Sequence, residues 1–67
     1  MNNRIRELRE KYSFTQQELS DKVDVSRQTI ISLESGKYNP TIFLAYKIAK
    51  TFNLAIEEVF LFEEEKI

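Results

Sequence analysis

Hydrogen-bonding side chains are gathered at one point of this sequence, where a helix is expected to begin. The run Ser26-Arg27-Gln28-Thr29 opens the segment 26–35. Gln and Arg can each form a pair of hydrogen bonds with base edges in the DNA major groove, and the first turn of a helix offers free backbone amides to a phosphate. Polar residues at a helix start are also ordinary caps and solvated surface. The neighbouring elements must therefore show whether this run contacts DNA bases or is an ordinary solvated helix start.

The composition excludes most catalytic chemistry. The 67 residues include no Cys and no His, so disulfides, thiolate zinc sites, imidazole bases and Cys or Ser–His nucleophiles are excluded. Glu57 and Glu58 stand side by side, but neighbours on a helix point about 100° apart, and no nucleophile or set of metal ligands accompanies them. We expect no enzyme, no metal site and no cofactor.

The charge is distributed unevenly along the chain. Residues 1–50 hold nine Lys or Arg against six Asp or Glu, and residues 51–67 hold one against five, which yields the net charge of −1. A mildly basic body with an acidic end permits nucleic-acid binding without requiring it, and an ordinary solvated surface explains it equally well. The run Glu63–Glu65 is interpreted as a solvated tail rather than a cation site.

Length and hydropathy predict one small intracellular domain. No apolar run in the 67 residues approaches the roughly 18 that span a membrane, and the first residues lack the apolar region of a signal peptide. The missing cysteines agree with a cytoplasmic, nucleoid-associated protein without a membrane partner. Because so small a core yields only a few kcal/mol of net stability, self-association would help it.

Short helices are expected throughout, because Gly36 and Pro40 are the only strong breakers. Thr15 and Glu18 form a capping-box pattern, whereas Ala55 cannot cap the segment after it. The apolar periodicity predicts an all-α fold, a compact five-helix bundle with helices at about 3–12, 15–23, 26–35, 41–52 and 56–60. The fourth helix is expected to carry an apolar face of Ile42, Ala45, Ile48, Ala49 and Phe52.

The second and third of these helices form the informative pair. They occupy residues 15–35 and are separated only by Asp24-Val25. Val25 is apolar in an otherwise polar turn, so we expect it to tuck under the pair and set the angle between the helices. This is the layout of a helix-turn-helix, whose second helix presents its first residues to the DNA major groove.

The stretch from Ile5 to Phe60 resembles the Cro/CI/Xre-type helix-turn-helix domain, a lambda-repressor-like DNA-binding fold of bacterial and phage transcription regulators. Five segments carry the resemblance: IRELR from residue 5, FTQQEL from residue 14, VSRQTI from residue 25, LESGKYNP from residue 33 and residues 45–49. The resemblance implies a DNA-binding domain over residues 4–60 with the motif at about 15–35. Residues 61–67 form an acidic and apolar tail.

Functional roles follow from the resemblance, position by position. Gln28 is expected to be the main base reader, Arg27 to divide between base and phosphate, and Gln16 to contact phosphate and brace a base-reading side chain. The loop of residues 37–39 is expected to grip the sugar-phosphate backbone. The full DNA-contacting set is Gln16, Ser26, Arg27, Gln28, Thr29, Ser32, Lys37, Tyr38 and Asn39. Arg9 and Glu34 match a structural salt bridge between the first and third helices.

Four residues depart from the family pattern. Ser20 and Asp24 stand where the family usually has Ala and Gly, so Asp24 must adopt a turn geometry that Gly takes more easily. Ile31 and Phe43 are apolar where the family is commonly polar. Ile31 either touches a thymine methyl or packs on the fourth helix, and Phe43 either packs on Ile31 or is exposed.

Four consecutive apolar residues, Val59-Phe60-Leu61-Phe62, precede the acidic tail. Either they complete the core, or some form a dimer contact. We favour a homodimer contact through Phe60, Leu61 and Phe62, which could pair as a short C-terminal strand with the same segment of a second copy. A two-fold dimer would place two recognition helices about 34 Å apart and implies a palindromic DNA site.

Two function classes therefore remain. The first is a sequence-specific double-stranded DNA-binding transcriptional regulator, a repressor that binds a palindromic operator as a homodimer. The second is a protein-interaction module on the same scaffold, such as a co-regulator or antitoxin whose partner binds the tail. The intact run of Arg27, Gln28 and Thr29 favours the first class. No small-molecule effector is evident.

Overall fold

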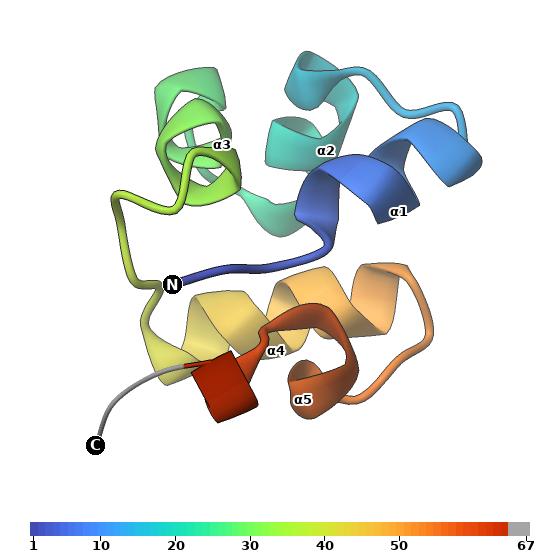
Figure 1. Ribbon diagram of the computed structural model, residues 1–67. Coiled ribbons are helices and arrows are strands. Elements are labelled where there is room, and N and C mark those ends of the chain that lie inside the picture. Colours follow the sequence, from blue (N-terminus) through green and yellow to red (C-terminus); the bar gives the residue numbers. More distant parts are fainter. Residues whose placement is uncertain (65–67) are drawn as a thin grey trace.

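The computed structural model describes residues 1–64 and is helical, as predicted (Figure 1). Its elements are α1 (Ile5–Lys11), α2 (Gln16–Val23), α3 (Arg27–Glu34), α4 (Ile42–Thr51), α5 (Ile56–Val59) and a 3-10 turn, η1 (Phe62–Glu64). The first helix begins at Ile5 rather than near Asn3, because the Asn3 Oδ1 accepts a hydrogen bond from the Ile5 amide at 3.1 Å and ends the preceding segment there.

The expected C-terminal strand is wrong for the part of the tail that the structure describes. Phe62–Glu64 forms η1, and the only β-type pairing within residues 1–64 is an isolated antiparallel bridge between Asn3 and Phe60 of the same chain. The amide of Leu61 donates to the Asn2 carbonyl at 2.9 Å, so this backbone is occupied within the chain. Residues 65–67 of the predicted tail lie outside the described residues.

Side-chain caps begin three helices where the sequence predicted them. The amide of Glu18 donates to the Thr15 hydroxyl at 3.0 Å, and the Thr15 amide donates to the Glu18 carboxylate at 2.8 Å, which completes a capping box. Ser26 and Thr41 cap α3 and α4. Ala55 supplies no side-chain cap to α5, as expected, although its amide donates to the Glu58 carboxylate at 2.8 Å.

Four residues adopt the left-handed backbone conformation, at helix ends or in the turns between helices. Gly36 and Asn53 have φ of 79° and 57°, as expected of helix ends, and Asp24 adopts φ of 61° in the turn after α2. Ser13, between α1 and α2, has φ of 59°, which no sequence signal indicated. The turn geometry predicted for Asp24 is therefore confirmed in spite of its side chain.

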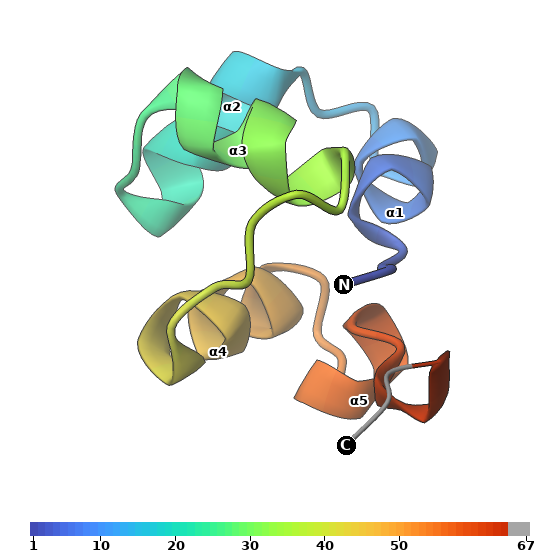
Figure 2. The ribbon, with the colours of Figure 1, turned by 60° about the vertical axis from the view of Figure 1, so that its left-hand side comes forward.

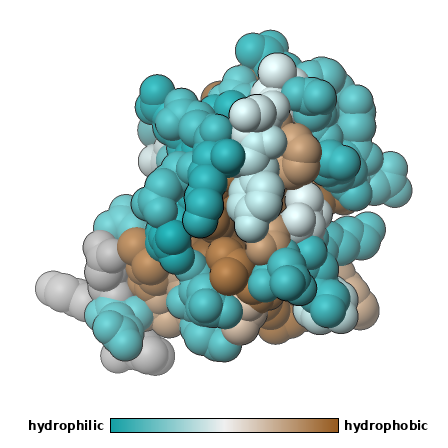
Figure 3. Space-filling view, turned by 90° about the vertical axis from the view of Figure 1, so that its right-hand side faces the viewer, coloured by the Kyte–Doolittle hydropathy of each residue, from teal (hydrophilic) through white to brown (hydrophobic). Residues whose placement is uncertain are grey.

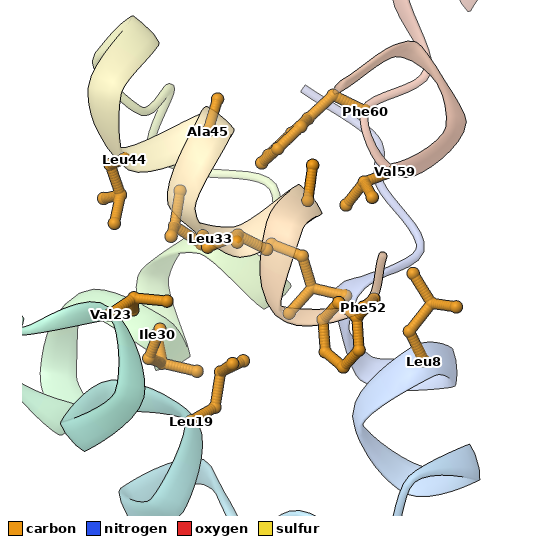
Figure 4. Packing of buried hydrophobic residues seen from close by; sticks show 13 residues of the cluster. Leu8, Leu19, Val23, Ile30, Leu33, Leu44, Ala45, Phe52, Val59 and Phe60 are labelled. Atoms are coloured by element: carbon orange, nitrogen blue, oxygen red, sulfur yellow. The ribbon is translucent and has the colours of Figure 1, made fainter. Parts of the chain in front are cut away.

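One apolar core joins all five helices. Its buried residues are Ile5, Leu8, Leu19, Val23, Ile30, Leu33, Leu44, Ala45, Ile48, Ala49, Phe52, Val59 and Phe60. Figure 4 shows Val59 and Phe60 turned inward with this cluster. Phe60 is only 1% exposed in the single chain. The prediction that it forms a dimer contact is therefore wrong, because its ring completes the core of its own chain.

The predicted apolar face of α4 needs one further correction. Ile42 is 72% exposed, whereas Leu44 is buried. Ile42 lies at the first residue of α4, so it borders an apolar groove with Ala45, Ile56 and Phe62 at the margin of the core. Phe43 is 77% exposed, which agrees with the second of its two expected placements.

Two layers of helices result. Figures 1 and 2 show α1, α2 and α3 in the upper half and α4 and α5 in the lower half, with the N-terminal segment between them. Figure 3 shows hydrophobic surface gathered in the lower half of one face, below a largely hydrophilic upper half. Among the described helices, none has the length and hydropathy needed to cross a bilayer.

Candidate nucleic-acid interface

The start of α3 forms one wall of a polar groove. Ser26, Gln28, Thr29 and Ser32 line it from α3 and its cap, and Lys37 and Tyr38 line it from the loop that follows. The structure thus brings together six of the nine residues predicted to contact DNA. Gln28 and Lys37 are exposed, so their hydrogen-bonding and charged groups are available to a ligand. The groove presents a hydrogen-bonding row on one side and a cation on the other.

Two hydroxyls in this groove also have a structural role. The Ser26 hydroxyl accepts from the Thr29 amide at 3.3 Å, and the two hydroxyl oxygens lie 3.0 Å apart. Ser26 therefore holds the first turn of α3 in place while its side chain faces the groove. This cap fixes the direction in which Arg27 and Gln28 leave the helix.

A second polar groove includes Arg27, the first residue of α3. It is lined by Arg6, Arg9, Thr15, Gln16, Gln17, Arg27 and Glu34, which come from α1, α2 and α3. Arg27 is exposed at the first residue of α3, next in sequence to Gln28 of the first groove. Two neighbouring residues of α3, Arg27 and Gln28, thus line different polar grooves.

The predicted Arg9–Glu34 salt bridge lies in this second groove. The Arg9 Nε lies 2.7 Å from one Glu34 oxygen, and a second guanidinium nitrogen lies 3.3 Å from the other. The side chains are only 13% and 7% exposed. Hydrogen bonding to Glu34 raises the pKa of Arg9, and a further N–H donates to the Phe14 carbonyl at 3.0 Å. The pair ties α1 to the end of α3, as expected.

Gln16 contacts this ion pair. Its Nε2 donates to a Glu34 oxygen at 3.3 Å. In the free protein its partner is therefore the carboxylate at the end of α3, and the bracing of a base-reading side chain stays a prediction. An amide has a second N–H and a carbonyl oxygen, so Gln16 keeps groups for a ligand. Its predicted contact with phosphate stays a prediction.

Asn39 is separated from the other loop residues. Its Oδ1 accepts from the Met1 amino group at 3.3 Å, and the same amino group donates to the Gly36 carbonyl at 2.9 Å. Asn39 borders the apolar groove with Pro40 and Ile42, whereas Lys37 and Tyr38 line the polar one. Its DNA contact stays a prediction. In the free protein its side-chain oxygen already accepts a hydrogen bond from the Met1 amino group.

Two residues of the polar surface escaped the sequence analysis. Arg6 and Gln17 line the second groove beside Arg9 and Gln16. Arg6 precedes Arg9 by three positions, which places both on one side of α1, and this spacing could have identified Arg6 once Arg9 had been assigned.

Comparison with known proteins decides the family. A helix-turn-helix family model matches residues 5–59. The chain belongs to this helix-turn-helix family, of the Cro/CI/Xre type. It is 57% identical over 67 residues to an uncharacterized HTH-type transcriptional regulator of the archaeon Archaeoglobus fulgidus, covering all of this chain and 96% of that protein. It is also 40% identical over 62 residues to the competence pilus inhibition repressor of Acinetobacter baylyi, covering 90% of this chain and 54% of that protein.

A solved structure shows the same helix-turn-helix fold. The restriction-modification controller protein C.AhdI of Aeromonas hydrophila superposes with a TM-score of 0.78 and 26% identity, over 85% of this chain and 86% of that one. The relatives come from archaea as well as bacteria. The motifs therefore do not indicate a bacterial or phage source specifically.

Contacts within the helix-turn-helix explain how it tolerates its unusual residues. Ser20 is fully buried, and its hydroxyl donates to the Gln17 carbonyl at 2.8 Å, so it fits the close contact between α2 and α3 without an unpaired group. Val25 packs against the core, as expected, and its amide donates to the Ser20 carbonyl at 3.0 Å. The turn is therefore held from both sides.

Proposed function

We propose that this helix-turn-helix protein is a transcriptional regulator that binds double-stranded DNA and reads its sequence with α3. The observation that carries the proposal is the exposed pair Arg27 and Gln28 at the capped start of α3, with the cation of Lys37 across the groove. A recognition helix contacts base edges with these first residues. Gln28 is the expected main base reader, because its amide can pair bidentately with adenine.

The proposal includes a homodimer on a palindromic operator. Ile42, Phe43 and Tyr46 of α4 and Phe62 of η1 are large apolar or aromatic side chains left exposed. Lys47 and Lys50 of α4 are exposed in the same half as the acidic Glu57, Glu58 and Glu63. A two-fold axis would bring the basic part of one copy to the acidic part of the other. With Phe60 buried, we assign the dimer contact to Phe62, Leu61 and α4.

Regulation by repression is the simplest mechanism for such a protein. The described residues form one helix-turn-helix domain, and a relative of similar sequence is named a repressor. A bound dimer would cover the promoter and exclude the transcription machinery. This activity places the protein with the chromosome inside the cell.

A protein-interaction module is the second candidate, because the exposed apolar side chains of α4 and η1 could also contact a different protein. A co-regulator or antitoxin would cover this surface with a different protein rather than with a second copy. Such a module would show little DNA affinity by itself.

Selection from random DNA tests the proposal. The protein is incubated with a random duplex library at about 150 mM salt, where non-specific binding is weak, and the bound fraction is sequenced. We expect a palindromic motif with half-sites about ten base pairs apart. Salt-sensitive background binding without an enriched motif would contradict the proposal and favour the interaction module.

A further inference from the structure

The side chain of Asn3 joins the first residues of the chain to the end of α3. Its Nδ2 donates to the Leu33 carbonyl at 2.8 Å and to the Met1 carbonyl at 3.2 Å. Its Oδ1 accepts from the Ile5 amide at 3.1 Å, which is the ordinary turn of an Asn at a helix start. The bond to Leu33 crosses 30 positions of the chain and is not needed to begin α1.

The Leu33 carbonyl is the group at which the loop after α3 begins. It also accepts a hydrogen bond from the Gly36 amide at 3.0 Å. One carbonyl oxygen thus receives donors from both Asn3 and Gly36. Gly36 has φ of 79°, so its backbone sets the direction in which the loop leaves the helix. Asn3 therefore contacts the point where that direction is set.

The loop that follows carries part of the polar groove. Lys37 and Tyr38 line the groove directly after Gly36, and Lys37 is exposed. The Gly36 carbonyl accepts from the Met1 amino group at 2.9 Å. The start of the loop is therefore held by the N-terminal segment on both sides of Gly36.

The N-terminal segment is itself anchored to the other layer of helices. Asn3 forms the isolated antiparallel bridge with Phe60, and the Arg4 amide donates to the Val59 carbonyl at 2.8 Å. Val59 and Phe60 are buried in the core, so the backbone of Asn3 has a fixed position. Figures 1 and 2 show this segment between the two layers. The core thus supplies the reference against which Asn3 holds the loop.

We propose that Asn3 is a positioning residue for DNA binding, which holds the end of α3 so that the loop presents Lys37 to a phosphate of duplex DNA. The inference rests on the proposed function and concerns a residue that lines neither polar groove. A Lys side chain is a flexible point charge, so the direction of its backbone decides which phosphate it reaches. Contacts to phosphate in turn fix the register of a recognition helix.

Asn3→Ser separates the two roles of the side chain. A Ser hydroxyl can accept from the amide two residues on, as the Asn carbonyl does, so the start of α1 is kept. The hydroxyl is too short to reach the Leu33 carbonyl in place of the amide. Asn53→Ser is the matched control, because Asn53 is exposed after α4 and lines neither polar groove. Ser13 shows that Ser adopts the left-handed backbone that Asn53 has.

The salt dependence of DNA binding measures the phosphate contact of Lys37. For each bound copy, one lost contact lowers the slope of log K against log salt by about 0.9 and weakens binding about fivefold at about 150 mM salt. We expect Lys37→Gln to show this loss, Asn3→Ser to show most of it and Asn53→Ser to show none. Equal slopes for Asn3→Ser and Asn53→Ser would overturn the proposal.

A double variant tests whether Asn3 acts through Lys37. If it does, Asn3→Ser causes little further loss of affinity once Lys37→Gln has removed the charge. A purely structural effect at the start of α1 does not depend on Lys37, so the two losses would then add. Additive losses would therefore overturn the positioning role.

Folding of each variant is checked by circular dichroism melting. If Asn3→Ser does not fold, Asn3→Asp replaces it, with Asn53→Asp as the control of equal charge. Asn3→Asp keeps the acceptor for the Ile5 amide and loses the donor to Leu33, so the same slopes are expected.

The positioning role and the proposed function fail in different ways. If an operator is enriched and Asn3→Ser binds it as Asn53→Ser does, the positioning role is wrong and the proposed function stands. If no operator is enriched, the proposed function is wrong. Phosphate contacts carry no sequence information, so the slopes can then still be compared on a duplex of random sequence.

Discussion

Gln28 lies exposed in the polar groove, one residue after Arg27 at the start of α3. Gln28→Ala removes a neutral side chain that is not needed for packing. We therefore expect specific DNA binding to weaken by about 1–3 kcal/mol while non-specific binding and its salt slope are unchanged. Binding titrations on operator and scrambled duplexes measure both quantities. Equal losses on the two duplexes would contradict a base-reading role.

The Arg9–Glu34 pair is the second residue-scale feature with a direct consequence. Arg9→Met strands a carboxylate that is only 7% exposed, so unfolding free energy should fall by about 3 kcal/mol. Adding Glu34→Leu removes the stranded charge and should recover most of the loss, because two apolar side chains can replace a buried pair. Urea denaturation compares the variants. A double variant no more stable than Arg9→Met would contradict this account.

The start of α2 shows how a short helix depends on its cap. Hydrogen bonds from the Thr15 amide and hydroxyl lower the pKa of Glu18 below its ordinary value. A lowered folded-state pKa means that the ionised carboxylate stabilises the fold above the unfolded pKa of about 4.3, and that this contribution is lost as pH falls through the folded pKa. The capping box of α2 is therefore sensitive to acid.

Comparison with Glu18→Gln isolates this acid sensitivity, because Gln keeps the hydrogen-bonding shape of the cap and does not titrate. Thermal melting from neutral pH down to about pH 3 should show the native chain more stable above about pH 5 and the difference vanishing in acid. Glu7 titrates similarly, because Arg4 lowers its pKa, but it does so in both proteins. A stability difference independent of pH would contradict the assignment.

At the element scale, the capping residues in the sequence correctly predicted where helices begin. Thr15, Ser26 and Thr41 cap their helices as predicted, since a cap depends on residues within one turn. The Glu58 carboxylate accepts from the Ala55 amide, a contact that Ala55 does not signal because its own side chain has no acceptor. The left-handed Ser13 had no signal either, since Ser is not specific to that conformation.

At the scale of the whole molecule, the apolar surface of α4 and η1 predicts self-association. Tyr46 and Tyr38 are both exposed tyrosines, one on α4 and one in the polar groove. Sedimentation at tens of micromolar should show a dimer for the native chain and for Tyr38→Asp. Tyr46→Asp and Phe62→Asp should instead give monomers, since a buried unpaired charge opposes assembly. A native chain that stays monomeric would exclude the dimer.

The amino-acid sequence alone determined the helices, the caps of α2, α3 and α4, the turn after α2 and the polar residues that open α3. These features depend on contacts within a few residues and on motif spacing. The Arg9–Glu34 pair could therefore be predicted from the sequence alone, and the base-reading roles of Gln28 and Arg27 stay predictions.

Only the tertiary structure decided which apolar residues are buried and which charges meet. Phe60 and Phe62 are alike in type and near in sequence, yet one completes the core and the other is exposed, because Phe60 pairs with Asn3 whereas Phe62 begins the 3-10 turn η1. Arg6 joined the polar surface only when α1 lay beside α2 and α3. Burial and charge clustering depend on distant segments meeting in space, and the periodicity of one helix cannot specify them.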